Sequence, residues 1–142
     1  MSKSNAFEND LLELIFNAVA IPNLADNAAT SPLTNLYVSL HTADPGEAGD
    51  QTTSECAYTS YARVAVARTS GGWTITGNSV SPAANIDFQA ATGGTETATH
   101  VAIGAASTGT GKILYSGAIT PNISISTGVT PRIGTGATIT ED

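Results

Sequence analysis

One stretch decides the fold: Leu36-Tyr-Val-Ser-Leu-His-Thr-Ala-Asp-Pro-Gly46. Apolar and polar residues alternate from Leu36 to His41, which is the two-residue period of a β-strand with one buried face. Asp44-Pro45-Gly46 ends the strand, because proline lacks an N–H and glycine tolerates positive φ. The alternation puts His41 on the polar face, so we expect its side chain to be exposed to solvent.

An amphipathic helix is predicted before this strand, over residues 6–20. Asn5 and Glu8 have the spacing of a capping pair at its start. Pro22 ends it, because proline cannot donate to a helical hydrogen bond. This helix docks on the chain's own β body, on a sister subunit or on a larger assembly, and the sequence leaves these open. Its apolar face carries Phe7, Leu11, Leu14 and Ile15.

Short strands dominate the chain after a polar, proline-punctuated connection over residues 22–35. Turn signals recur between them about every eight to twelve residues, a rhythm typical of a β-sandwich or jelly roll. We therefore predict a mainly β fold, a jelly-roll-like β-sandwich of about eight short antiparallel strands with one N-terminal amphipathic helix. The helix and its tether occupy 1–35 and the β body 36–142, within a single domain overall. A turn or bulge at Gly77-Asn78 interrupts the third predicted strand. The predicted strands are 36–42, 61–68, 73–81, 86–90, 99–105, 113–119, 123–126 and 137–140.

Composition narrows the class of partner. The 142 residues include 12 acidic and 5 basic ones, for a net charge of −7. A nucleic-acid partner is not expected, because phosphate neutralisation needs clustered Lys and Arg. A membrane partner is not expected either, since the apolar run 11–21 contains Glu13 and Asn17 and is too short to cross a bilayer. The first residues do not form a secretory signal, so we expect synthesis and folding in a cytoplasm.

Catalytic chemistry has little support in the sequence. Thiol catalysis would need Cys56 beside His41 or His100, and no glycine motif typical of an oxyanion hole flanks this cysteine. A sugar hydrolase would need two carboxylates flanking a cleft, and nothing in their spacing singles out Asp87 and Glu96. We therefore predict a non-enzymatic protein without catalytic residues.

Metal and cofactor sites are likewise not predicted. The loop 43–57 spans an EF-hand-like separation, but Gly46 and Ala48 stand where such a loop needs side-chain oxygens. Gly104–Lys112 superficially resembles a phosphate-binding loop, but it lacks the Gly-Lys-Ser/Thr ending and lies between two strands, so we predict a hairpin turn. The loop 43–57 is then a solvated acidic loop, whose carboxylates are Asp44, Glu47, Asp50 and Glu55.

Several segments carry a resemblance to a known family. The sequence resembles a family of short proteins encoded by tailed phages and prophages, whose members are usually labelled tail-fibre proteins. A compact all-β module of this size is also similar to the cement, or decoration, proteins of phage heads, which bind the capsid as dimers or trimers. The resemblance brings no catalytic residues with it. It covers nearly the whole chain and rests on 4–12, 36–46, 51–55, 61–68 and 91–95.

The resemblance implies a virion structural protein. Because the sequence lacks the elongated repeats of a fibre shaft, our leading hypothesis is a decoration protein on the capsid surface. Its partner would be the phage major capsid protein, and it would form a homo-oligomer, a dimer or a trimer. The alternative is a tail or baseplate component, either tail-fibre-like or a receptor-binding module. The contact residues we predict are Phe7, Leu11, Leu14 and Ile15 in the helix, and Asp44, Glu47, Asp50 and Glu55 in the acidic loop.

Overall fold

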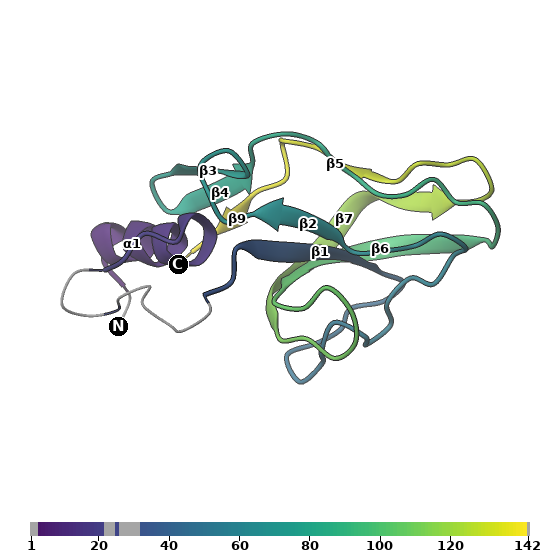
Figure 1. Cartoon of the computed structure of the whole chain (residues 1–142), viewed down its shortest axis with the longest axis horizontal. Coiled ribbons are helices and arrows are strands. Elements are labelled where there is room, and N and C mark those ends of the chain that lie inside the picture. Colours follow the sequence, from purple (N-terminus) through teal and green to yellow (C-terminus); the bar gives the residue numbers. More distant parts are fainter. Residues whose placement is uncertain (1–2, 22–24, 26–31, 142) are drawn as a thin grey trace. The chain divides into compact units, whose positions relative to one another are not determined.

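The computed structural model describes residues 3–21, 25 and 32–141 (Figure 1). The described residues form one helix near the N-terminus and nine strands, so the predicted mainly β class is confirmed. A jelly-roll arrangement is compatible with these strands and stays a prediction. The elements are α1 (Asn5–Asn17), β1 (Asn35–His41), β2 (Val64–Ala67), β3 (Trp73–Thr76), β4 (Ser79–Pro82), β5 (Ile86–Asp87), β6 (Glu96–Gly104), β7 (Ile113–Ile125), β8 (Arg132–Ile133) and β9 (Ile139–Thr140).

The strands form three sheets, with the orders β2-β1-β6-β7, β3-β4-β9 and β5-β8. The pairs β1/β6, β6/β7, β3/β4 and β4/β9 are antiparallel. The chain divides into two compact units. The first, here called the helix unit, combines residues 1–35, 67–86 and 133–142, and the second, the sheet unit, combines 36–66 and 87–132. The domain organisation predicted from the sequence, with 1–35 and 36–142 inside a single domain, stays a prediction.

In the helix unit, α1 starts and ends at residues other than those predicted. Ser4 caps it, because its hydroxyl oxygen accepts a hydrogen bond from the Phe7 N–H, so the predicted Asn5–Glu8 capping pair was wrong. The helix ends at Asn17, short of Pro22, because Ala18 adopts a left-handed conformation with φ 57°. No helix among the described residues has the length and apolar character needed to cross a membrane.

The helix packs in cis, against β3 and β4. Leu12 and Phe16 are fully buried, and the Phe16 ring meets Trp73 edge-on with 4.8 Å between centroids. The predicted contact residues of α1 lie beside this buried stripe and are only partly buried. Periodicity therefore located an apolar face, whereas the fully packed stripe of the helix lies next to it and contains Glu8, Leu12 and Phe16.

The sheet that receives the helix is built from a short hairpin. Strands β3 and β4 pair from Trp73↔Pro82 to Thr76↔Ser79, and β9 adds to β4 at Val80↔Ile139. Gly77 occupies the turn with φ +61°, a conformation that glycine adopts without strain. The turn predicted at Gly77-Asn78 is thus confirmed.

In the sheet unit, β1 is a central strand that pairs with β6 from Tyr37↔Gly104 to His41↔His100. β6 and β7 form a long hairpin, so the turn predicted over Gly104–Lys112 is confirmed. The two strands predicted over 113–119 and 123–126 are one continuous strand, β7. The register shifts between Ala98 and His100, which lets β7 carry extra residues across that point.

Candidate interaction surfaces

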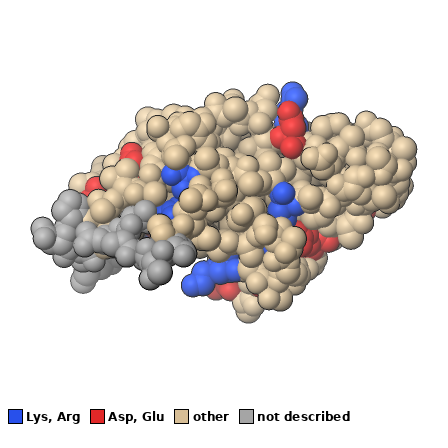
Figure 2. Space-filling view, in the orientation of Figure 1, with Lys and Arg blue, Asp and Glu red and all other residues tan. Residues whose placement is uncertain are grey.

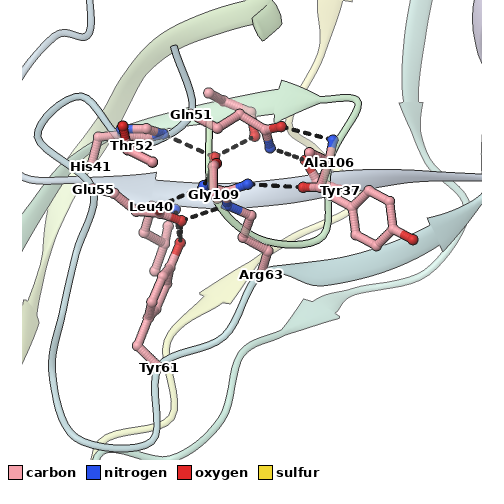
Figure 3. A network of polar contacts seen from close by, with 12 residues as sticks. Tyr37, Leu40, His41, Gln51, Thr52, Glu55, Tyr61, Arg63, Ala106 and Gly109 are labelled. Carbon is pink, nitrogen blue, oxygen red and sulfur yellow. Dashed lines mark hydrogen bonds and ion pairs between the residues drawn. The ribbon is translucent and has the colours of Figure 1, made fainter. Parts of the chain in front are cut away.

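A polar network ties the acidic loop 43–57 to the central strand β1 (Figure 3). We call it the loop clamp, and it consists of the side chains of His41, Gln51, Glu55, Tyr61 and Arg63 with the backbone groups they bind. All of these residues belong to the sheet unit. The clamp decides which acidic side chains of the loop remain available for contacts with other molecules.

Gln51 is the buried anchor of the loop clamp, with no exposed surface. Its Oε1 accepts from the Ala106 N–H at 2.9 Å, and its Nε2 donates to the Tyr37 carbonyl at 3.4 Å (Figure 3). Two glycines make room for this side chain: a Cβ at Gly104 would lie 2.1 Å from Gln51 Cδ, and one at Gly111 would lie 2.1 Å from its Oε1. The loop and the β6–β7 hairpin are therefore fitted to each other.

Glu55 and Arg63 form the charged part of the loop clamp, with side chains that are 16% and 3% exposed. Arg63 Nε and Nη2 donate to the two Glu55 oxygens at 2.7 and 2.8 Å, a bidentate pair. Arg63 also donates to the carbonyls of Ala106 and Gly109 at 2.9 and 2.8 Å. The hydrogen bonds to Glu55 are the main cause that raises the pKa of Arg63. One guanidinium thus connects the loop to the hairpin turn.

Tyr61 completes the loop clamp from the side of β1. Its hydroxyl donates to Glu55 at 2.9 Å and accepts from the Leu40 N–H at 3.1 Å. Burial is the main cause that raises the pKa of this phenol. The side chain is therefore a neutral link between the strand and the carboxylate.

His41 is fully buried, so the expectation that it is exposed was wrong. Its Nδ1 donates to the Thr53 carbonyl at 2.8 Å, and its Nε2 lies 2.9 Å from the Ser39 hydroxyl. Because a carbonyl only accepts, Nδ1 carries the proton in this arrangement and Nε2 accepts from Ser39. Burial lowers the pKa of His41. The loop 43–57 folds back over the face of β1 that the alternation marked as polar.

Cys56 is buried and carries an unreactive thiol. Burial, followed by the negative charge of Glu96, raises its pKa to about 12. The thiolate is the nucleophilic form of cysteine, and very little of it exists at neutral pH with such a pKa. Both ring nitrogens of His41 are bonded elsewhere, and His100 Nδ1 lies 2.9 Å from the Thr99 hydroxyl. The Cys–His chemistry considered from the sequence therefore gains no support.

The two carboxylates considered for sugar hydrolysis also have structural partners. Asp87 forms a bidentate pair with Arg132, whose hydrogen bond is the main cause that lowers the pKa of Asp87. Glu96 accepts from the backbone N–H groups of Ala57 and Tyr58 at 2.9 to 3.1 Å. Both carboxylates hold local structure in the sheet unit.

The four acidic residues of the predicted contact loop differ in how available they are. Asp44 is exposed and accepts from the Gly46 N–H at 2.9 Å, and Glu47 is exposed. Asp50 accepts from the N–H and hydroxyl of Thr52 at 2.7 and 2.6 Å, the first causes that lower its pKa, and Glu55 belongs to the loop clamp. In the part of the chain that the structure describes, no three Asp, Glu, His or Cys side chains gather as a metal site would require.

Sequence reasoning missed the residues that hold the units together internally. Gln51 and Arg63 act over long sequence separations, which local periodicity does not reveal. Arg68 also joins distant segments, in the helix unit, where it donates to the carbonyls of Leu14, Ile15 and Leu33 at 2.7 Å each. The sequence did contain one signal for the two arginines, because Arg63 and Arg68 are two of only five basic residues and flank the same short strand, β2.

These features define a small, mainly β protein in which buried polar side chains fasten loops to a sheet. The family described as Podophage GP4 fiber I protein gp80 matches residues 2–141, and the chain belongs to this family. No curated protein matches the sequence. The family supports the predicted class, a bacteriophage virion structural protein, and its description names a fibre protein.

Proposed function

We propose that this chain is a structural component of the phage tail, a module of the fibre apparatus. The observation that carries the proposal is the match to a fibre-protein family over residues 2–141. It favours the tail or baseplate alternative over the capsid-decoration hypothesis, because the family description names a fibre and not a head protein.

The sheet unit supports a mechanical role. The loop clamp fixes the loop 43–57 and the turn after β6 through a bidentate ion pair and buried hydrogen bonds. Residues held in this way keep their geometry when a neighbouring protein binds, so less ordering entropy is lost on association. The face in Figure 2 shows scattered charges over its described residues, which suits docking through neutral surface more than through a charged patch.

The contact residues predicted from the sequence remain part of this proposal. The partly buried helix residues Phe7, Leu11, Leu14 and Ile15 form an apolar row next to the stripe that packs on β3 and β4. Among the loop acids, Asp44 and Glu47 are the exposed ones. We propose these residues as the first positions to examine in contacts with neighbouring virion proteins.

Location in the particle tests the proposed function. Virions carrying an epitope-tagged copy of the chain would be labelled with gold-conjugated antibody, and copy number would be measured on stained gels of purified particles. We expect label at the tail and a low copy number relative to the major capsid protein. Label spread over the head, with a copy number that scales with the capsid lattice, would overturn the tail proposal and favour decoration of the major capsid protein.

A further inference from the structure

The two edges of the four-stranded sheet differ in how they are protected. The edge strand β2 has four residues and is flanked by Arg63 and Arg68. The opposite edge strand, β7, has 13 residues and contains no charged residue. Natural proteins protect open sheet edges with short strands and with charged side chains. β2 is protected by its shortness, whereas β7 is long and contains no charged residue.

The first half of β7 is accessible to another strand. The sheet order ends at β7, whose described pairing is with β6. Ser116, Gly117 and Ala118 are exposed, and no heavy atom lies within 4 Å of the position that a Gly117 Cβ would occupy. An edge strand directs alternate N–H and C=O groups outward, and small side chains allow a second backbone to approach it.

Pro121 sets the limit of the stretch that can pair. Proline has no N–H to donate to a ladder. The register between β6 and β7 is also irregular at this level, between the pairs Ala98↔Ile123 and His100↔Ala118. A second shift lies between the pairs Ile103↔Tyr115 and Gly104↔Ile113, so the regular part of β7 at the sheet edge is Tyr115–Ala118, which is long enough for a short ladder.

We infer that a second copy of this chain pairs with β7, edge to edge and antiparallel, to join two sheets into one. An identical antiparallel strand is self-complementary about a two-fold axis. An axis through Gly117 sets each copy's Ser116 opposite the other copy's Ala118, and both side chains are small. This self-association is a property of the purified chain, so the inference does not depend on where the protein lies in the virion.

Charge restricts where a second copy can bind. Each chain carries a net charge of −7, so two copies repel one another over most of their surfaces. From Ile113 to Pro131 the sequence has no charged residue. The repulsion is therefore weakest where the neutral β7 edges meet, and hydrogen bonds between the two ladders supply the attraction.

The test is sedimentation of the purified full chain over a range of concentrations. We expect dimers of the wild type, and a dissociation constant raised roughly tenfold or more in the double variant Ser116→Glu/Ala118→Glu, since like charges then face each other across the strands. Mixing the double glutamate variant with Ser116→Lys/Ala118→Lys should give mixed dimers, because opposite charges then face each other across the two strands. The matched control is Thr108→Glu/Thr110→Glu, two exposed positions of the hairpin turn, which should dimerise like the wild type.

Amide hydrogen exchange on the wild type gives a second measurement that does not depend on the folding of any variant. Protection of the β7 amides between Tyr115 and Ala118 should rise with protein concentration, while protection in β3 stays constant. A wild type that remains monomeric up to its solubility limit would overturn the inference and leave the edge to a different partner. Unchanged dimerisation of a folded Ser116→Glu/Ala118→Glu variant would overturn it as well.

Discussion

At the scale of single residues, the fit between Gln51 and Gly104 has the clearest consequence. A Cβ at Gly104 would lie 2.1, 2.4 and 2.5 Å from three atoms of the Gln51 amide. That amide is buried and held by the Ala106 N–H, so it has little freedom to move away. The two positions are therefore expected to be energetically coupled.

We predict that Gly104→Ala lowers the free energy of unfolding by about 1–3 kcal/mol, the usual range for overpacking a core. In a Gln51→Ala background the same substitution should cost less, because the clashing atoms are gone. Urea unfolding of the wild type, the two single variants and the double variant measures the coupling, with Gly136→Ala as the control at an open position. Equal effects of Gly104→Ala in both backgrounds would show that Gln51 is not the obstacle.

Cys56 gives a prediction about alkaline pH. Its folded pKa, about 12, lies above the ordinary value of 9.0, so the fold favours the neutral thiol. A group of this kind contributes stability that is complete below pH 9 and is lost as the pH rises toward 12. Tyr58, whose pKa burial also raises to about 12, contributes in the same direction.

We therefore expect wild-type stability to fall between pH 8 and pH 10.5, and to fall less steeply in Cys56→Ala. Urea unfolding at the two pH values measures both slopes. Tyr58 is present in both proteins, so the difference between the slopes reports the thiol together with its effect on the pKa of Tyr58. If stability falls equally steeply with pH in the wild type and in Cys56→Ala, the thiol has the same pKa in the folded and unfolded chains.

At the scale of elements, Arg68 acts as the C-terminal cap of α1. The last carbonyls of a helix lack intrahelical partners, and the Arg68 guanidinium donates to those of Leu14 and Ile15. It also donates to Leu33, after the helix. A side chain that follows β2 in the sequence thus holds the end of the helix.

Arg68→Ala should lower the free energy of unfolding by about 2 kcal/mol, the range for hydrogen bonds to a charged group. Arg68→Lys should recover only part of this, because an ammonium group lacks the planar fork that reaches several carbonyls at once. Fluorescence of Trp73, the one tryptophan, follows urea unfolding of the helix unit. A stability of Arg68→Ala equal to that of the wild type would argue against the capping role.

Elements were predicted well where the signal is local. The helix, the hairpin at Gly77 and the turn between β6 and β7 follow from periodicity and glycine positions, and all three are present. Helix boundaries were less accurate, because Ser4 and Ala18 set them through backbone conformations that several residue types adopt. Strand β8 was missed, since two residues are too few to show a period.

At the scale of the whole molecule, the division into units changes the interpretation of the helix. The helix as a whole could have served as a free anchor, but its stripe of Leu12 and Phe16 is buried, and Phe16 packs on Trp73 within the same unit. Removing α1 would therefore expose the core of the helix unit. Contacts with other virion proteins are better sought at the partly buried helix row, at Asp44 and Glu47, and at the β7 edge.

The sequence by itself determined the mainly β class, the N-terminal helix, the hairpin turns and the neutral character of β7. Each of these depends on residues a few positions apart, whose backbone preferences act locally. Only the tertiary structure decided that His41 is buried, which stripe of α1 is covered, and that Gln51 and Arg63 bind the β6–β7 turn. Those outcomes depend on side chains that meet across tens of residues, where packing and the pairing of buried polar groups select the partner.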